Sequence, residues 1–108
     1  MTRGELYWVD LDPTLGSEAN KRRPCVIVSN DANNRAAATV TVVPVTSRVT
    51  RVYPFEVLLE GVLERPSKAQ AHQVRTVSKM RLVGDAIARL DDEPMHELDE
   101  ALRLHLAL

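Results

Sequence analysis

Basic and polar side chains that suit phosphate chemistry gather in three short stretches of the sequence. A guanidinium presents a planar fork of N–H donors to phosphate oxygens, a hydroxyl orients one oxygen, and a carboxylate accepts a proton. The residues are Ser17, Glu18, Lys21, Arg22 and Arg23, then Thr46 and Ser47, then His72, Gln73 and Arg75. Taken singly, such residues more often solvate a loop or cap a strand. Together they indicate a phosphate site that works without a metal.

Metal and nucleotide motifs are missing from the sequence. His96 and His105 lie nine residues apart, so on one helix they face opposite sides and do not share a metal. His72 is remote from both, and no glycine-rich phosphate loop is present. Cys25 is the only cysteine and lies in an apolar segment, where a packed side chain is expected. We therefore expect no metal, no cofactor and no disulfide.

The charge is unevenly distributed along a chain whose 108 residues and 44% hydrophobic content suit one domain, residues 1–108. Residues 1–82 carry 12 Lys and Arg against 8 Asp and Glu, whereas residues 83–108 carry 2 against 7. A basic face that meets a polyanion is therefore expected. No apolar run approaches the roughly 20 residues that span a bilayer, and the N-terminus lacks an apolar signal core. A cytoplasmic protein without membrane contact is the expectation.

Short strands separated by turns are expected to position the candidate phosphate-site residues. Strands are expected at 5–11, 25–30, 39–47 and 53–59, with further strands within 67–77 and 84–90, and 31–35 is expected to be a turn. This pattern predicts a small barrel or sandwich. The long connection over residues 12–23 exceeds the usual length of about 4–6 residues, which favours a functional loop.

The C-terminal segment changes to helical periodicity. Asp91 or Asp92 is suited to capping a helix, and Pro94 fits its first turn. The predicted buried stripe consists of Met95, Leu98, Leu102 and Leu106. Leu104 and Leu108 point away from it, so they are expected to be exposed or to contact a second subunit.

The segment RGELYWVDLDPTLGSEANKRRPCVIVSND resembles the N-terminal signature of the MazF/PemK toxins, the endoribonucleases of bacterial toxin–antitoxin modules. The similarity continues through VTVVPVTS, AQAHQVRTVSKMRL and LDEALRLHLAL, so it covers nearly the whole chain. The resemblance implies a mainly β fold with α, an SH3-like small β-barrel of the CcdB/PemK type with a C-terminal helix. It also implies a homodimer, and a cognate MazE-like antitoxin that binds through its acidic C-terminal tail.

The activity that the resemblance implies is metal-independent, sequence-specific cleavage of single-stranded mRNA, that of an mRNA interferase. The ribose 2′-hydroxyl attacks the adjacent phosphorus and leaves a 2′,3′-cyclic phosphate and a 5′-hydroxyl; DNA lacks this nucleophile. Arg23 and Thr46 match the catalytic pair of the family, and Glu18 matches an acidic position linked to proton transfer. A guanidinium stays protonated in proteins, so Arg23 is expected to stabilise phosphate charge, Thr46 to orient the phosphate and Glu18 to act as base.

RNA recognition is expected from the remaining polar residues. The pair His72 and Gln73, together with Ser17, Asn20 and Lys21, is the expected site of base recognition, and Arg22, Ser47 and Arg75 are expected to contact RNA. His72 stands where several relatives have an acidic residue, so the preferred RNA sequence need not match theirs.

Two alternatives remain open from the sequence. One is a gyrase-poisoning toxin of the same fold, against which the complete Arg-Pro plus threonine pair argues. The other is a non-catalytic RNA-binding barrel, for which the aromatic stacking platform of a sequence-tolerant binder is missing, since aromatic residues make up only 4% of the chain.

Overall fold

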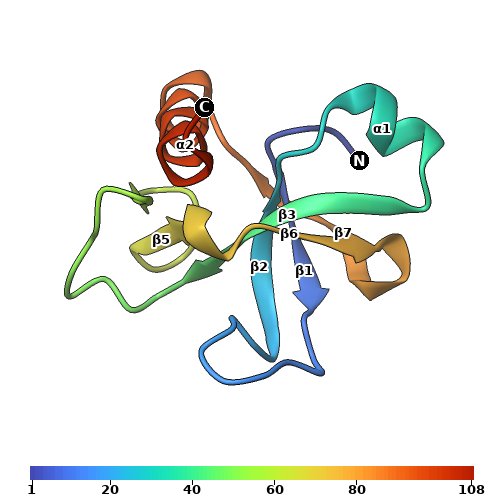
Figure 1. The fold of residues 1–108 in the computed structure, drawn as a ribbon, viewed down its shortest axis with the longest axis horizontal. Coiled ribbons are helices and arrows are strands. Elements are labelled where there is room, and N and C mark those ends of the chain that lie inside the picture. The colour runs from blue at the N-terminus through green and yellow to red at the C-terminus, as the bar shows by residue number, and fades with distance from the viewer.

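Seven short strands form one antiparallel sheet in the computed structural model, which describes residues 1–108 (Figure 1). The strands are β1 (Glu5–Asp10), β2 (Arg22–Ile27), β3 (Thr39–Thr46), β4 (Glu56–Leu59), β5 (Ser67–Gln70), β6 (Arg75–Ser78) and β7 (Leu82–Arg89). The helices are α1 (Asp31–Ala36) and α2 (Asp92–Leu106), with 3₁₀ turns η1 (Ala71–Gln73) and η2 (Lys79–Arg81). The mainly β fold with a C-terminal helix is confirmed.

The order of the strands is β4-β5-β3-β2-β1-β7, and the sheet branches at β3. One edge of β3 pairs with β2, while its other edge pairs with β6 over the first half and with β5 over the second half. The turn η1 separates β5 from β6, so the segment 67–77 is two strands. The end strands β4 and β7 do not pair with each other, and the sheet is therefore curved but not closed into a barrel.

Alternation along the strands builds two hydrophobic clusters on opposite faces of the sheet. In β2, Val26 belongs to a cluster that also contains Leu98 of α2, whereas Cys25 and Ile27 belong to a second cluster with Val40 and other residues of β1, β3 and β6. Successive residues of a strand point to opposite faces, which explains the separation. Cys25 is fully buried, and burial raises the pKa of its thiol to about 12, which makes it a packing residue as expected.

Helix α2 packs against the first of these clusters, but its last turn does not. Leu98 and Ala101 are buried, and Met95 and Leu102 are partly buried against the cluster. Leu106 was expected in the buried stripe, and this expectation is wrong, because its exposed fraction is 51%. Leu104 and Leu108 are exposed, as expected. No helix has the length and apolar character that crossing a membrane requires.

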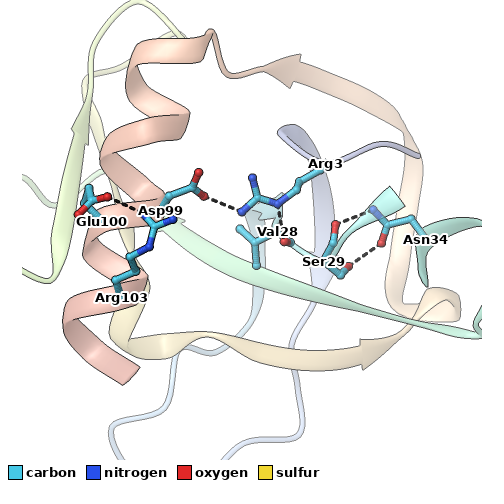
Figure 2. A network of polar contacts seen from close by, with 7 residues as sticks. All are labelled: Arg3, Val28, Ser29, Asn34, Asp99, Glu100 and Arg103. Atoms are coloured by element: carbon cyan, nitrogen blue, oxygen red, sulfur yellow. Dashed lines mark hydrogen bonds and ion pairs between the residues drawn. The ribbon is translucent and has the colours of Figure 1, made fainter. Parts of the chain in front are cut away.

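A network of polar contacts joins the N-terminal segment to α2 (Figure 2). The Nε atom of Arg3 donates to the carbonyl oxygen of Val28 at 2.8 Å, and its Nη2 atom forms an ion pair with Asp99 at 2.6 Å. Both side chains are about one third exposed, which keeps such a pair weak. The contact therefore orients α2 over the end of β2, while the apolar cluster supplies most of the stabilisation.

The segment 31–35 forms helix α1 and not the expected turn. The Oδ1 atom of Asn30 accepts the backbone N–H of Asn33 at 2.8 Å, which caps the helix. Asn34 is buried, and its Nδ2 donates to the carbonyl oxygen of Ser29 at 2.9 Å. Polar capping contacts and not an apolar stripe specify this helix, so hydrophobic periodicity did not indicate it.

Candidate active site

Two adjoining hollows share Arg23, Thr46 and Ser47. The first has a volume of about 540 Å³ and the second of about 370 Å³. Besides the shared residues, the first hollow is lined by Trp8, Arg22, Pro24, Val45, Leu63, Glu64, Arg65 and Ser67. The second is lined by Ser17, Glu18, Ala19, Asn20, Arg48, Lys68, Gln70 and Gln73. The shared residues therefore lie where two cavities of different composition meet.

The pairing of β2 with β3 brings Arg23 and Thr46 together. Cys25 is paired with Pro44 and Ile27 with Val42 in this antiparallel ladder. The ladder ends at Cys25 and Pro44, and just beyond it Arg23 and Thr46 both line the two hollows. Twenty-two residues lie between them in sequence, but the antiparallel pairing of β2 with β3 brings both residues to the same site.

Arg23 keeps part of its guanidinium free. Its Nε atom donates to the carbonyl oxygen of Asn20 at 2.9 Å, and Nη2 lies 3.4 Å from Oδ1 of the same residue. Its Nη1 atom has no hydrogen-bond partner in the protein and remains available to an anion. The Oγ1 atom of Thr46 accepts the backbone N–H of Arg48 at 3.3 Å, so its own proton is free to be donated. The pair thus offers a guanidinium and a hydroxyl that hydrogen bonds keep oriented.

Long-range hydrogen bonds hold the loop between β1 and β2. Gln73 accepts the N–H of Ala19 at 2.9 Å through Oε1 and donates to the carbonyl oxygen of Ser17 at 3.1 Å through Nε2. Arg75 donates through Nη1 to the carbonyl oxygen of Leu11 at 3.0 Å. In Figure 1 this loop extends from the end of the sheet that faces away from the two helices. The conformation of this loop therefore depends on η1 and β6, which supply Gln73 and Arg75, as well as on the loop itself.

The structure brings most of the predicted site residues to the hollows, but not all. Ser17, Glu18, Asn20, Ser47 and Gln73 line the second hollow. The carboxylate of Glu18 is exposed and accepts the N–H of Leu15 at 3.1 Å. Arg22 lines the first hollow. Lys21, His72 and Arg75 line neither hollow.

His72 is turned away from the hollows and toward the interior. Its ring meets the ring of Phe55 edge-on, with centroids 4.6 Å apart, and its Nδ1 atom is buried without a hydrogen-bond partner. Burial lowers the pKa of His72, although the nearby Glu56 opposes the shift. Of the expected base-reading pair, only Gln73 reaches a hollow, because consecutive residues of η1 face different directions.

A buried ion pair that the sequence did not indicate joins Lys68, which lines the second hollow, to Glu56. The Nζ atom of Lys68 donates to Oε1 of Glu56 at 2.9 Å and to the carbonyl oxygen of Arg51 at 2.7 Å. The two side chains are 9% and 2% exposed. Burial acts to raise the pKa of Glu56, but the N–H of Tyr53 and the ammonium of Lys68 outweigh it and lower the pKa. Lys68 therefore anchors the segment after Ser47 and is not a free cation.

Trp8, Arg48 and Arg65 are among the other lining residues that the sequence did not indicate. Arg48 and Arg65 come from segments without a recognisable motif, whereas Trp8 lies within the N-terminal signature but had no site role assigned to it. Each reaches a hollow through strand pairing or loop placement. The alternation of β1 was the one available signal for Trp8, since it follows Leu6 by two residues.

Sheet, terminal helix and basic hollow define a small mainly-β protein with a site suited to an anionic ligand. A family model described as PemK-like, MazF-like toxin of type II toxin–antitoxin system matches residues 2–106. The chain belongs to this family.

Relatives and solved structures agree with this assignment. The chain is 49% identical to the endoribonuclease MazF9 of Mycobacterium tuberculosis, over 100% of this chain and 98% of the relative. It is 39% identical to the endoribonuclease EndoA of Bacillus subtilis, over 98% and 94%. The crystal structure of MazF from Deinococcus radiodurans has a TM-score of 0.89 at 28% identity, over 100% and 97%. An endoribonuclease solved with its cognate antitoxin from a mycobacterial species has a TM-score of 0.83 at 29% identity, over 100% and 96%.

Proposed function

We propose that this chain is an endoribonuclease toxin that cleaves single-stranded RNA at a short sequence without a metal ion. The observation that carries the proposal is that Arg23 and Thr46 both lie at the junction of the two hollows. The two close relatives named as endoribonucleases support the RNA substrate. Cleavage of mRNA places the action of the protein in the cytoplasm.

The proposed reaction uses the 2′-hydroxyl of the RNA as nucleophile. The free Nη1 of Arg23 stabilises negative charge on the pentavalent phosphate, and Thr46 donates its proton to one phosphate oxygen. Glu18 lines the same hollow and accepts the proton of the 2′-hydroxyl. The P–O bond to the 5′ oxygen of the next nucleotide breaks, and that oxygen takes up a proton. The metal-independent step rests on this set of guanidinium, hydroxyl and carboxylate groups.

Cleavage of a long defined RNA in EDTA tests the proposal. We expect cuts at one short sequence, with 5′-hydroxyl ends that a ligase accepts only after treatment with a kinase. A substrate with 2′-deoxyribose at the cut position is the matched control and should stay intact. Cleavage that required added Mg²⁺, or that left 5′-phosphate ends, would contradict the mechanism. Inhibition of gyrase supercoiling without RNA cleavage would favour the gyrase-poisoning alternative.

The proposal includes a homodimer and an antitoxin partner. Several apolar side chains are exposed, among them Val83 and Ile87 on β7, and Leu104 and Leu106 on α2, with Leu108 beyond its end. Contact with a second copy would cover such side chains, and a stable interface buries about 1,600 Å² in total. An acidic, disordered antitoxin tail suits the basic hollows, since such a segment wraps a large surface. The relative solved with its cognate antitoxin supports this partner.

A further inference from the structure

The two hollows differ in chemistry although they share Arg23 and Thr46. Ala19 is the only apolar residue of the second hollow, which is otherwise lined by hydroxyl, amide and charged side chains. The first hollow has an apolar wall made of Trp8, Pro24, Val45 and Leu63. A nucleotide chain that crosses the junction therefore meets hydrogen-bonding groups on one side and an apolar wall with an indole on the other.

Trp8 is exposed because the apolar cluster of its face ends before reaching it. It lies two residues after Leu6, so both side chains are on the same face of β1. Leu6 is fully buried in the cluster under α2, whereas Trp8 is 41% exposed. Its cross-strand neighbour on β2 is Pro24, which also lines the first hollow. Strand pairing thus fixes the backbone of Trp8, and its partly exposed side chain offers surface to a ligand.

The charges around this wall favour an anionic chain with apolar faces. Arg22, Arg23 and Arg65 line the first hollow against one carboxylate, that of Glu64. Bases of single-stranded nucleic acids stack on aromatic side chains, while cations track the backbone. A purely apolar peptide would leave these guanidinium groups without partners.

We propose that the first hollow is a nucleobase subsite, in which the base next to the scissile phosphate stacks on Trp8. The inference rests on the proposed function and extends it. Stacking tolerates any base, whereas hydrogen bonds from Asn20 and Gln73 in the second hollow select one. The chain therefore reads the two sides of the cleaved bond differently, and its selectivity is stricter on the side of the second hollow.

The fluorescence of Trp8 tests the subsite directly, because it is the only tryptophan in the chain. The probe is the cleaved RNA sequence with 2′-deoxyribose at the cut position, which binds without being cut. We expect its binding to change the emission of Trp8 with the same midpoint that the anisotropy of a labelled RNA gives. The same RNA with an abasic residue on the side of the first hollow should bind with a much smaller emission change. An abasic residue on the opposite side should leave the change intact.

Substitution of Trp8 supplies the second test. Trp8→Leu should weaken RNA binding by about tenfold or more, the scale of one base–aromatic stack, with little effect on the single-turnover rate at saturating RNA. Trp8→Phe, which keeps an aromatic face, should restore most of the affinity. In Trp8→Leu the abasic substitution should cost nothing further. Circular dichroism and thermal melting check folding, and the fluorescence test on the unaltered chain does not depend on these variants.

Three results would overturn the subsite. The first is that the emission of Trp8 does not change at saturating RNA. The second is that the abasic residue lowers the RNA affinity equally in the wild type and in Trp8→Leu. The third is that the emission changes with protein concentration but not with RNA concentration. The last result would assign Trp8 to a contact between copies of the chain. A chain that cuts no RNA at all contradicts the proposed function instead, so the two failures are distinguishable.

Discussion

Arg23 and Thr46 illustrate how a site residue depends on its own contacts. Asn20 holds the Nε side of the Arg23 guanidinium, and the N–H of Arg48 fixes the hydroxyl oxygen of Thr46. Both groups are therefore oriented before an RNA binds. Preorganised donors of this kind contribute to rate because they need no reorientation as charge develops.

Loss of either group should abolish most of the cleavage. We expect Arg23→Ala and Thr46→Ala each to lower the single-turnover rate by about 10²-fold or more while the fold stays intact. Arg23→Lys should recover little, because an ammonium does not reproduce the guanidinium fork. Arg35→Ala on α1, away from both hollows, is the matched control. Near-normal rates in a folded Arg23 or Thr46 variant would contradict their roles, and a full rate in Glu18→Gln at every pH would remove Glu18 as the base.

At the scale of elements, the pairing of β3 with β5 supports the second hollow. Thr46 is the cross-strand partner of Lys68, whose ammonium binds Glu56 of β4 and the carbonyl oxygen of Arg51. This ion pair fixes the 47–55 segment against the sheet. Ser47 and Arg48, which line the hollow, begin that segment.

Removing one partner of this pair should destabilise the chain strongly. Lys68→Met leaves the carboxylate of Glu56 buried and unpaired, which is expected to cost about 3–5 kcal/mol in the free energy of unfolding. The double variant Lys68→Met with Glu56→Leu should recover most of that loss, because no unpaired charge remains. Urea denaturation near neutral pH measures both. Equal stability of the single and double variants would contradict a coupled pair.

The pH dependence follows from the lowered pKa of Glu56. Its contribution to stability is fully present above its unfolded pKa of about 4.3 and is lost as the pH falls through the lower folded value. The difference in stability between wild type and the single variant Lys68→Met should therefore shrink as the pH falls, from the raised folded pKa of the unpaired Glu56 in the variant down to the lowered folded pKa in the wild type.

At the scale of the whole molecule, charge is divided between faces. The two hollows carry Arg22, Arg23, Arg48 and Arg65, whereas α2 begins with Asp92 and Glu93 and continues with further acidic residues. A polyanion is therefore attracted to the hollows and repelled by the start of the helix. RNA and an acidic antitoxin tail should compete for the same surface.

Charge reversal at arginines that line the two hollows should weaken the binding of both ligands. We expect Arg22→Glu combined with Arg48→Glu to lower the affinity for RNA and for an acidic antitoxin peptide, and to make both less dependent on salt. Arg35→Glu with Arg89→Glu changes the net charge equally at positions outside the hollows and should have little effect. Fluorescence anisotropy at several salt concentrations measures the four affinities. A peptide affinity that is unchanged while RNA binding is lost would place the antitoxin elsewhere.

The sequence by itself determined the features that are local or carried by family resemblance. Alternating apolar residues predicted β1 and β3 within a residue or two at each end. In a strand with one buried face, apolar side chains occur at every second position, so the pattern is visible in the sequence. The change to helical period predicted α2, and the order of motifs predicted the family. Arg23, Thr46 and the first loop were likewise named from their motifs.

The tertiary structure alone decided where the remaining side chains lie. Lys21, Arg22 and Arg23 are adjacent in sequence, but only the two arginines line a hollow. His72 and Gln73 are also adjacent, but the partly buried ring of His72 packs against Phe55, whereas Gln73 holds the loop. Trp8 and Lys68 reach the hollows through pairings between distant segments. Strand register and loop placement depend on contacts between residues that are distant in sequence. A local sequence pattern does not predict such contacts.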